Sequence, residues 1–368
     1  MMEKSGGEMS GTQYMYVGCF TAIDRGGSGT GGIVVYKREK SKPWKQIQIV
    51  ENFNPSYLSL SEDKRFLYGI QGKGSRVFSY AISEQSGMLS SLNSVETTAG
   101  LACEAYGGYL YIVAGTVQIY KLEDDGSIGE KMQDFMPTGI VGPISKTQKC
   151  AQPHHILHDA QNRFFAVPCR GMDVVHVYDY NPKSNAVEDI CAMQTYGASY
   201  PRHIAFHPEL PIAYLLLERY GMVLTCHYED GVLTPVEMLP TVPSDFVGLY
   251  NAAGEIFVHP SKRWLGISNR GHNSIVLFHI REDGSLCDPQ WTRGPISVPR
   301  FYSFSQDGTE LYCANIGETP TDRPLMGEAE AIPGTGSITV FRVDTQTGTL
   351  QFTGEKIDIP APSCILFR

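Results

Sequence analysis

Short blocks of apolar residues, five or six long, recur along the chain and are separated by turn residues. Between residues 53 and 80 the pattern predicts strands at 56–60, 66–70 and 76–80, with a fourth strand beginning near Met88. Large apolar and polar residues alternate only weakly within these blocks, which is typical of strands buried on both faces. No stretch shows helical periodicity over about ten residues, so an α/β fold with parallel strands is excluded.

The same succession of strand, turn and strand recurs, which makes an internal repeat the main organising feature. Each third strand is followed by a dipeptide suited to a tight hairpin, where one residue must tolerate a positive φ. These dipeptides are Asp125-Gly126, Asp230-Gly231, Asp283-Gly284 and Thr347-Gly348. Further copies of the repeat span 152–180, 200–228, 251–280 and 298–343, and a degenerate copy spans 101–122.

The two ends of the chain complement each other. Residues 361–366 match a first strand, although the sequence ends there, whereas residues 14–19 and 32–36 match second and third strands that lack a first one. If the C-terminal strand completes the N-terminal sheet, six whole copies and one shared copy make seven blades. The sequence therefore predicts an all-β, seven-bladed β-propeller over residues 14–368, closed by its last strand. A β-sandwich or two stacked barrels would not explain a period of about fifty residues.

Composition narrows the classes of partner. The 368 residues carry 39 acidic against 30 basic side chains, a net charge of -9, which disfavours binding to nucleic acid. No apolar run approaches the roughly 20 residues of a membrane span. Residues 1–13 are rich in Gly and Ser, lack the apolar segment of a signal peptide and are expected to be a disordered leader. The nine cysteines form no CxxC pair, which favours reduced thiols, a cytoplasmic location and the absence of zinc or iron–sulfur sites.

Charged residues interrupt the repeat at two equivalent positions. In a propeller the first strand of each blade lines the central channel. Four copies align on Pro153, Pro201, Ala253 and Pro299, each near the start of this first strand. Polar groups then stand at the residue that follows and again sixteen residues later, at the end of the second strand. Antiparallel pairing brings these two positions to the same end of the ring. The first set is His154, Arg202, Gly254 and Arg300, and the second is Arg170, Glu218, Arg270 and Ile316.

Four arginines around one carboxylate and one imidazole predict a positive site in a net-negative protein, suited to a small anion. Either His154 or Glu218 could transfer protons. His203 and Asn269, which adjoin Arg202 and Arg270, are further predicted substrate contacts. Because neighbouring residues of a strand face opposite sides, His155, His203 and Glu255 could instead point into the sheet.

Several segments resemble the seven-bladed propeller lactonase family, which includes bacterial propeller-type 6-phosphogluconolactonase and fungal carboxy-cis,cis-muconate cyclase. The resemblance extends over residues 14–367. It implies a metal-independent enzyme acting on a lactone. The family's active-site His, Arg, Glu and Arg would fall on His154, Arg202, Glu218 and Arg270. The segments are Gln152-Pro153-His154, Tyr200-Pro201-Arg202-His203, Leu217-Glu218, Ser268-Asn269-Arg270-Gly271-His272 and residues 360–367.

The chain also departs from the family pattern. It has Pro168-Cys169-Arg170-Gly171 where the family commonly has Pro-Asp-Leu-Gly, which exchanges an acid for a cation. The third blade, at residues 101–104, lacks the family's usual Pro-Cys-His and Asn-Tyr. These departures bear on the identity of the substrate rather than on the class of reaction.

The leading hypothesis is hydrolysis of an anionic sugar lactone, 6-phosphogluconolactone by family default. His154, assisted by Glu218, would activate water, while Arg202 and Arg270 hold the anion and stabilise the oxyanion. Arg170 and Arg300 would add substrate contacts. One alternative is lactonisation of a carboxylated muconate, which Arg170 favours, and another is a non-catalytic scaffold, which needs no charged channel. We expect no cofactor, no metal, a monomer or weak homo-oligomer, and a small anion as the partner.

Overall fold

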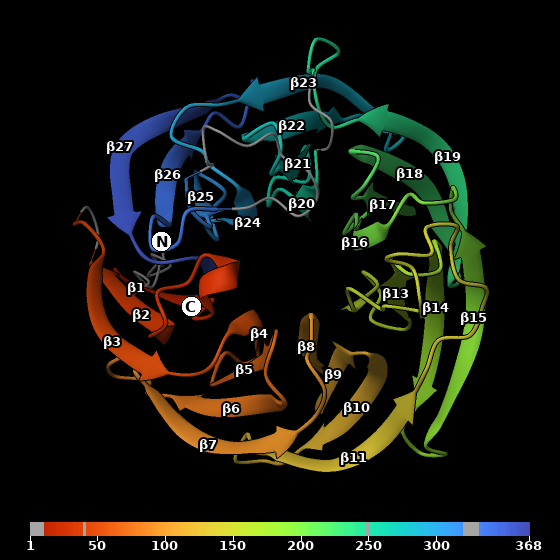
Figure 1. Ribbon diagram of the computed structural model, residues 1–368, viewed down its shortest axis with the longest axis horizontal. Coiled ribbons are helices and arrows are strands. Elements are labelled where there is room, and N and C mark those ends of the chain that lie inside the picture. The colour runs from red at the N-terminus through yellow and green to blue at the C-terminus, as the bar shows by residue number, and fades with distance from the viewer. Residues whose placement is uncertain (1–10, 40–41, 248–250, 319–330) are drawn as a thin grey trace, which may run out of the picture.

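Seven four-stranded antiparallel sheets surround a central axis as the blades of a propeller (Figure 1). The computed structural model describes residues 11–39, 42–247, 251–318 and 331–368. Within them the only helical element is the short 3₁₀ turn η1 (Ile23–Arg25), and no helix is long and apolar enough to cross a membrane. The predicted seven-bladed β-propeller is therefore confirmed.

Each blade runs from an innermost strand at the axis to an outermost strand at the rim. The innermost strands are β28 (Pro362–Phe367), β4 (Pro55–Leu60), β8 (Ala102–Tyr106), β12 (Leu157–His158), β16 (Pro201–Phe206), β20 (Ala253–Val258) and β24 (Pro299–Phe304). The second strands are β1 (Thr12–Cys19), β5 (Phe66–Gln71), β9 (Tyr109–Ala114), β13 (Phe165–Cys169), β17 (Ile212–Leu217), β21 (Trp264–Asn269) and β25 (Glu310–Asn315). The third strands are β2 (Gly32–Glu39), β6 (Arg76–Ile82), β10 (Thr116–Leu122), β14 (Val174–Asn181), β18 (Met222–Glu229), β22 (Ser274–Ile280) and β26 (Ser337–Val343). The outermost strands are β3 (Lys45–Glu51), β7 (Leu89–Glu96), β11 (Ile128–Phe135), β15 (Ala186–Gln194), β19 (Val232–Pro240), β23 (Leu286–Thr292) and β27 (Leu350–Asp358).

Burial follows this order from the axis to the rim. Every residue of the second strands β17 and β21 is buried, whereas the outermost strands β3 and β27 are largely exposed. A strand with a blade on either side has no solvent face, so its sequence needs no alternation of apolar and polar residues. This burial explains why the repeat was visible mainly from its turns.

The ring closes as predicted, because β28 pairs with β1 in the order β28-β1-β2-β3. β1 begins at Thr12, two residues before the expected start of the propeller, and residues 1–10 of the expected leader lie outside the described residues. Closure leaves no strand of the first blade with an open inner edge.

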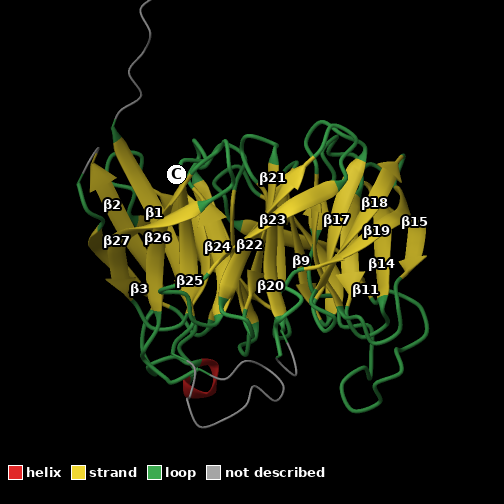
Figure 2. Cartoon of the chain, turned by 90° about the horizontal axis from the view of Figure 1, so that it is seen from above, coloured by secondary structure: helices red, strands yellow, loops and turns green. Residues whose placement is uncertain are grey.

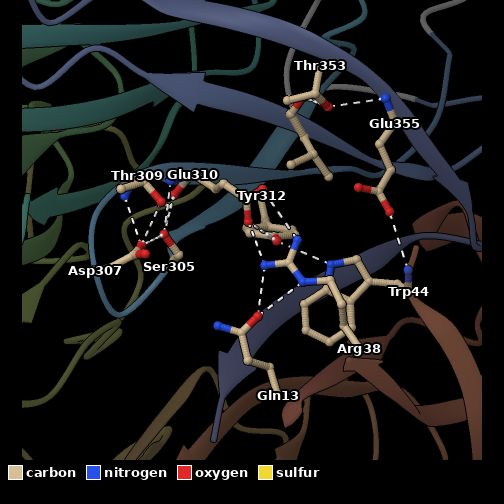
Figure 3. A network of polar contacts seen from close by, with 11 residues as sticks. Gln13, Arg38, Trp44, Ser305, Asp307, Thr309, Glu310, Tyr312, Thr353 and Glu355 are labelled. Atoms are coloured by element: carbon tan, nitrogen blue, oxygen red, sulfur yellow. Dashed lines mark hydrogen bonds and ion pairs between the residues drawn. The ribbon is translucent and has the colours of Figure 1, made fainter. Parts of the chain in front are cut away.

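A polar network seals the seam between the first and the last blade (Figure 3). Arg38 on β2 donates to both carboxylate oxygens of Glu310 on β25, at 3.3 and 2.7 Å. The Tyr312 hydroxyl donates to the same carboxylate at 2.6 Å and accepts a hydrogen bond from Trp44 Nε1 at 3.2 Å. The half-buried bidentate pair therefore adds directional bonds to the apolar contacts between the two blades.

The innermost strands begin and the second strands end on one face of the ring, which also carries η1 and the longer loops, at the bottom of Figure 2. Here the backbone is irregular. Tyr200 has a left-handed φ of 58° and accepts a hydrogen bond from Glu218 N at 2.9 Å. Left-handed residues stand at the same place in five other blades, namely Asn54, Gln152, Ala252, Val298 and Ala361.

A β-bulge follows this left-handed residue. Pro201 pairs with Leu217 and Ile204 with Leu215, so that two consecutive residues, Arg202 and His203, lie opposite one. An equivalent register shift in β20 places Gly254 and Glu255 at the positions that correspond to Arg202 and His203. A bulge re-aims side chains that regular alternation would send to opposite faces. Arg202, Gly254 and Arg300 lie at such register shifts, Glu218 and Arg270 directly follow the paired second strands, and His154 follows the bridge between Pro153 and Cys169.

Candidate active site

The carboxylate of Glu218 lies at the centre of the site. Its Oε1 is 2.5 Å from Nη2 of Arg270, while its Oε2 is 3.2 Å from Nε of Arg170 and 3.9 Å from Nε of Arg202. Arg170, Glu218 and Arg270 each directly follow the second strand of their blade, β13, β17 and β21, and Arg202 belongs to the innermost strand β16. The structure thus brings together four of the sequence-predicted residues, from three consecutive blades.

Glu218 is a fixed negative charge. Burial opposes its ionisation, but Arg170, Arg270 and Arg202 outweigh burial and lower the pKa of Glu218 to about 2. Burial also lowers the pKa of Arg202 to about 10, which still leaves the guanidinium protonated at neutral pH. The hypothesis that Glu218 itself takes a proton is therefore disfavoured, and its role is to hold the guanidinium groups.

Main-chain carbonyls fix the same arginines from the other side. Arg270 Nε donates to Ala252 O at 2.7 Å, and Arg202 Nη1 donates to Gly254 O. Gly254 has no room for a side chain, because a Cβ there would lie 2.6 Å from Ser268 Oγ and 3.0 Å from Arg300 O. The glycine at this repeat position lets the neighbouring blade approach and places its carbonyl for Arg202.

His154 lies beside this cluster as a buried, neutral imidazole. Burial, followed by the charge of Arg202, lowers the pKa of His154 well below its usual value, and its Nδ1 has no hydrogen-bond partner among the described residues. An uncharged imidazole retains a lone pair that can accept a proton. His154 is therefore better suited than Glu218 to act as a base.

The remaining arginines widen the positive region. Arg300 on β24 lies over the Phe20 ring, 4.9 Å from its centroid, and contributes to the field that lowers the pKa of His154. Arg170 lies over the Tyr200 ring at 4.8 Å, and its side chain is 20% exposed, against 6% for Arg270. Four guanidinium groups around one ionised carboxylate leave an excess of positive charge that favours an anion.

Asn269 occupies a different place from the one predicted. It is fully buried, donates to Thr241 O at 2.7 Å and accepts from Asn251 Nδ2 at 2.6 Å. These bonds tie the end of β21 to the preceding loop, directly before Arg270. In this structure Asn269 supports the position of Arg270, and the predicted substrate contact does not match its hydrogen bonds.

His203 Nδ1 lies 2.5 Å from Oε1 of Glu255, and the predicted contact of His203 with substrate stays a prediction. The alternative that His155, His203 and Glu255 point into the sheet is wrong. Tyr57 on β4, from the opposite side of the ring, lies within ring-contact distance of both His155 and His203. The bulges turn His203 and Glu255 towards the axis, which regular strand alternation could not indicate.

Asp173 is a supporting residue that the sequence analysis missed. Its buried carboxylate accepts hydrogen bonds from Ala198 N at 2.6 Å, Tyr200 N at 3.0 Å and Gln148 Nε2 at 2.9 Å. Gln148 also donates to Arg170 O at 3.0 Å, so that Asp173 ties the Arg170 turn to the next blade. The repeat alignment could have identified Asp173, because it stands at the left-handed turn position that Gly221 and Asn273 hold in the next two blades.

In the part of the chain that the structure describes, one group of side chains that could hold a metal ion lies away from the arginines around Glu218. Among the described residues, His279, Cys287 and Asp288 bring their ligand atoms within 4.8 Å of one another. They lie on β22 and β23, towards the rim of the sixth blade. The thiol of Cys287 is 3.5 Å from Nδ1 of His279, a contact that a hydrogen bond explains.

Comparisons with known proteins agree with the architecture. A family model described as Lactonase, 7-bladed beta-propeller matches residues 14–318. A 6-phosphogluconolactonase of Bacillus subtilis is 25% identical over 97% of this chain and 99% of its own length, and one of Pectobacterium carotovorum is 27% identical over 79% and 81%. A solved structure described as a periplasmic gluconolactonase of Pseudomonas aeruginosa has a TM-score of 0.84 at 24% identity, with 97% of this chain and 99% of that chain covered. The chain belongs to the seven-bladed β-propeller lactonase family.

Proposed function

We propose that this protein hydrolyses a small anionic sugar lactone, with 6-phosphogluconolactone as the leading candidate. The observation that carries the proposal is the ionised Glu218 among Arg170, Arg202 and Arg270, beside the neutral imidazole of His154. The names of the Bacillus subtilis and Pectobacterium carotovorum relatives support 6-phosphogluconolactone as the first substrate to test.

The four arginines divide by their surroundings. Arg202 and Arg270 are almost completely buried and are held by Glu218 and by main-chain carbonyls. Such fixed donors stabilise an oxyanion best, because they need no reorganisation as its charge develops. Arg170 is more exposed, and with Arg300 it would bind the anionic group remote from the carbonyl.

Hydrolysis requires one proton transfer in each direction. Water attacks the lactone carbonyl while His154 takes a proton from the water. Arg202 and Arg270 stabilise the negative charge that appears on the carbonyl oxygen. The ring C–O bond then breaks, and the imidazolium returns its proton to the departing alkoxide. An anionic substrate also offsets part of the arginine field, which raises the basicity of His154 when the substrate is bound.

A second candidate function is the lactonisation of a carboxylated muconate. Arg170, 3.2 Å from Glu218, adds a cation to the cluster, which favours a substrate with several carboxylates. A non-catalytic scaffold would gain nothing from buried arginines around a carboxylate, because buried charges are costly to desolvate.

The proposal extends to partner and location. A small anion is the partner, neither nucleic acid nor a membrane is involved, and the protein acts as a monomer or weak homo-oligomer in the cytoplasm. None of the nine cysteines forms a disulfide, which is consistent with a reducing compartment.

Steady-state hydrolysis of 6-phosphogluconolactone, unphosphorylated gluconolactone and carboxylated muconolactones tests the function and the site together. We expect turnover of the phosphorylated lactone, lowered about 10²–10³-fold in Arg270→Ala through loss of a transition-state donor. Arg342→Ala, on the exposed side of β26, serves as the matched control and should keep wild-type rates. Wild-type rates in both Arg270→Ala and Glu218→Gln would refute the site, and a wild-type protein inactive on every lactone would refute the function.

A further inference from the structure

A second acid–base group lies beside the proposed active site. His203 Nδ1 and Glu255 Oε1 are 2.5 Å apart, with side chains 3% and 1% exposed. The two residues come from neighbouring innermost strands, β16 and β20, and both occupy bulge positions. Neither has a role in the hydrolysis described above.

The histidines form a stack that leads to this pair. The rings of His155 and His203 are parallel, 4.3 Å apart and inclined by 5°, and the ring of His154 lies 5.2 Å from that of His203. Ile204 N donates to His155 Nδ1 at 3.5 Å, which assigns the ring proton of neutral His155 to Nε2, 3.4 Å from the Tyr57 hydroxyl. His203 therefore stands between His154 and the carboxylate of Glu255.

Unlike Glu218, Glu255 has no guanidinium within ion-pair distance among the described residues, and its partner there is His203. Its Oε1 accepts a hydrogen bond from Ile256 N at 3.1 Å, and its Oε2 is buried without a partner among the described residues. Burial, opposed by His155 and Arg202, raises the pKa of Glu255 to about 7. Burial and the nearby arginines lower the pKa of His203 well below its usual value. The charged and titratable groups that face the pair are His154, His155, Tyr57, Arg202, Arg270, Arg300, Glu218, Tyr302 and Cys364.

We propose that Glu255 and His203 act as one unit that accepts the proton which the product carboxylic acid releases, with His154 as the neighbouring imidazole that passes it on. The inference rests on the proposed lactonase function. Hydrolysis converts a neutral ester and water into an alcohol and a carboxylic acid, and the acid loses its proton near neutral pH. One proton must therefore leave the site in each turnover. A carboxylate that orients an imidazole through Nδ1 prepares Nε2 to receive a proton.

Kinetics of Glu255→Gln test the role of the pair. The amide can still accept a hydrogen bond from Nδ1 but cannot hold the proton. We expect kcat to fall about 10–100-fold at pH 7.5 with KM within about twofold of wild type. The wild-type rise of kcat with pH near 7 should disappear, because it requires the pair to lose its proton. Glu255→Asp should restore part of kcat and a pH-dependent limb.

A second carboxylate–imidazole pair, in which His158 is buried and Glu104 is 20% exposed, supplies the control. Glu104 Oε2 lies 2.8 Å from Nδ1 of His158, and His158 follows His154 by four residues in the sequence. Glu104→Gln removes a similar pair away from the arginine cluster and should keep the wild-type pH profile. Equal losses in Glu104→Gln and Glu255→Gln, or a raised KM with an unchanged pH profile, would show that the pair is only structural.

Nitrogen-15 NMR of the histidine side chains tests the pair without an assay of activity. We expect the His203 signals, assigned with His203→Gln, to report the titration of Glu255 near pH 7 in the wild type and to lose this transition in Glu255→Gln. Absence of the transition in the wild type overturns the inference even if the protein is an active lactonase. If the transition is present but the protein is inactive on every lactone, the proposed function is overturned. The catalytic role of the pair is then overturned with it.

Discussion

Glu218 and Glu255 are equally buried, yet their pKa values are shifted in opposite directions because they have different neighbours. Three guanidinium groups lower the pKa of Glu218 to about 2, whereas burial dominates at Glu255 and raises its pKa to about 7. Two carboxyl groups with separated pKa values divide the work of a site. Glu218 supplies a constant charge that organises the arginines, and Glu255 is the carboxylate that can exchange a proton.

The substitution Glu218→Gln should destabilise the protein in a pH-dependent way. The pKa of Glu218 lies below its value of 4.5 in the unfolded chain, so its ionised form stabilises the fold above about pH 4.5. This stabilisation is lost as the pH falls towards 2. Removing one partner of a buried ion pair costs about 3–5 kcal/mol. The melting temperature of Glu218→Gln should therefore lie well below that of the wild type at pH 7, and the gap should narrow by pH 3. A gap that does not change with pH would contradict this assignment of charge.

At the scale of the strand, the left-handed residue and the bulge that follows it build the site. Tyr200 turns the chain into β16, and the bulge brings both Arg202 and His203 to the axis. In the next blade the same device presents Gly254 O to Arg202 and Glu255 to His203. Sequence variation at these two positions changes the chemistry without altering the strands that carry it.

The substitution Gly254→Ala tests this device. A Cβ would lie 2.6 Å from Ser268 Oγ and 3.0 Å from the carbonyls of Pro299 and Arg300, so the backbone that binds Arg202 must move. We expect kcat/KM to fall at least about tenfold and stability to fall by about 1–3 kcal/mol. Gly197→Ala is the control, because its Cβ would meet only Pro143 at 3.5 Å. Equal activity of the two variants would show that the bulge does not position the arginines.

At the scale of the strand, the sequence predicts which charged residues come together but not where their neighbours point. The spacing between Pro201 and Glu218 recurs between Pro153 and Arg170, so the alignment identified the charged cluster correctly. It left open where His203 and Glu255 point, because a bulge changes the direction of side chains without changing that spacing. Asn269 failed for another reason, since it adjoins Arg270 in sequence while its hydrogen bonds fix the loop behind it.

For the whole molecule, ring closure and charge distribution act together. Pairing of β28 with β1 and the Arg38–Glu310 seam hold seven blades around one axis (Figures 1 and 3). Closure fixes Arg170, Arg202, Arg270 and Arg300, from four different blades, at one end of the axis. The chain has a net charge of -9, so this cluster is a local reversal of sign. Such a reversal favours a small anion that reaches the mouth over a polyanion that must cover the surface.

The most direct test is the ratio of kcat/KM for 6-phosphogluconolactone to kcat/KM for unphosphorylated gluconolactone, measured in wild type, Arg170→Ala and Arg270→Ala. We expect a ratio above about ten in the wild type, since a bound phosphate gains at least one charge-assisted contact. Arg170→Ala should lower this ratio while largely sparing the neutral lactone, and Arg270→Ala should slow both substrates. A wild-type ratio near one, or a ratio unchanged in Arg170→Ala, would contradict the claim that the arginine cluster selects an anionic lactone.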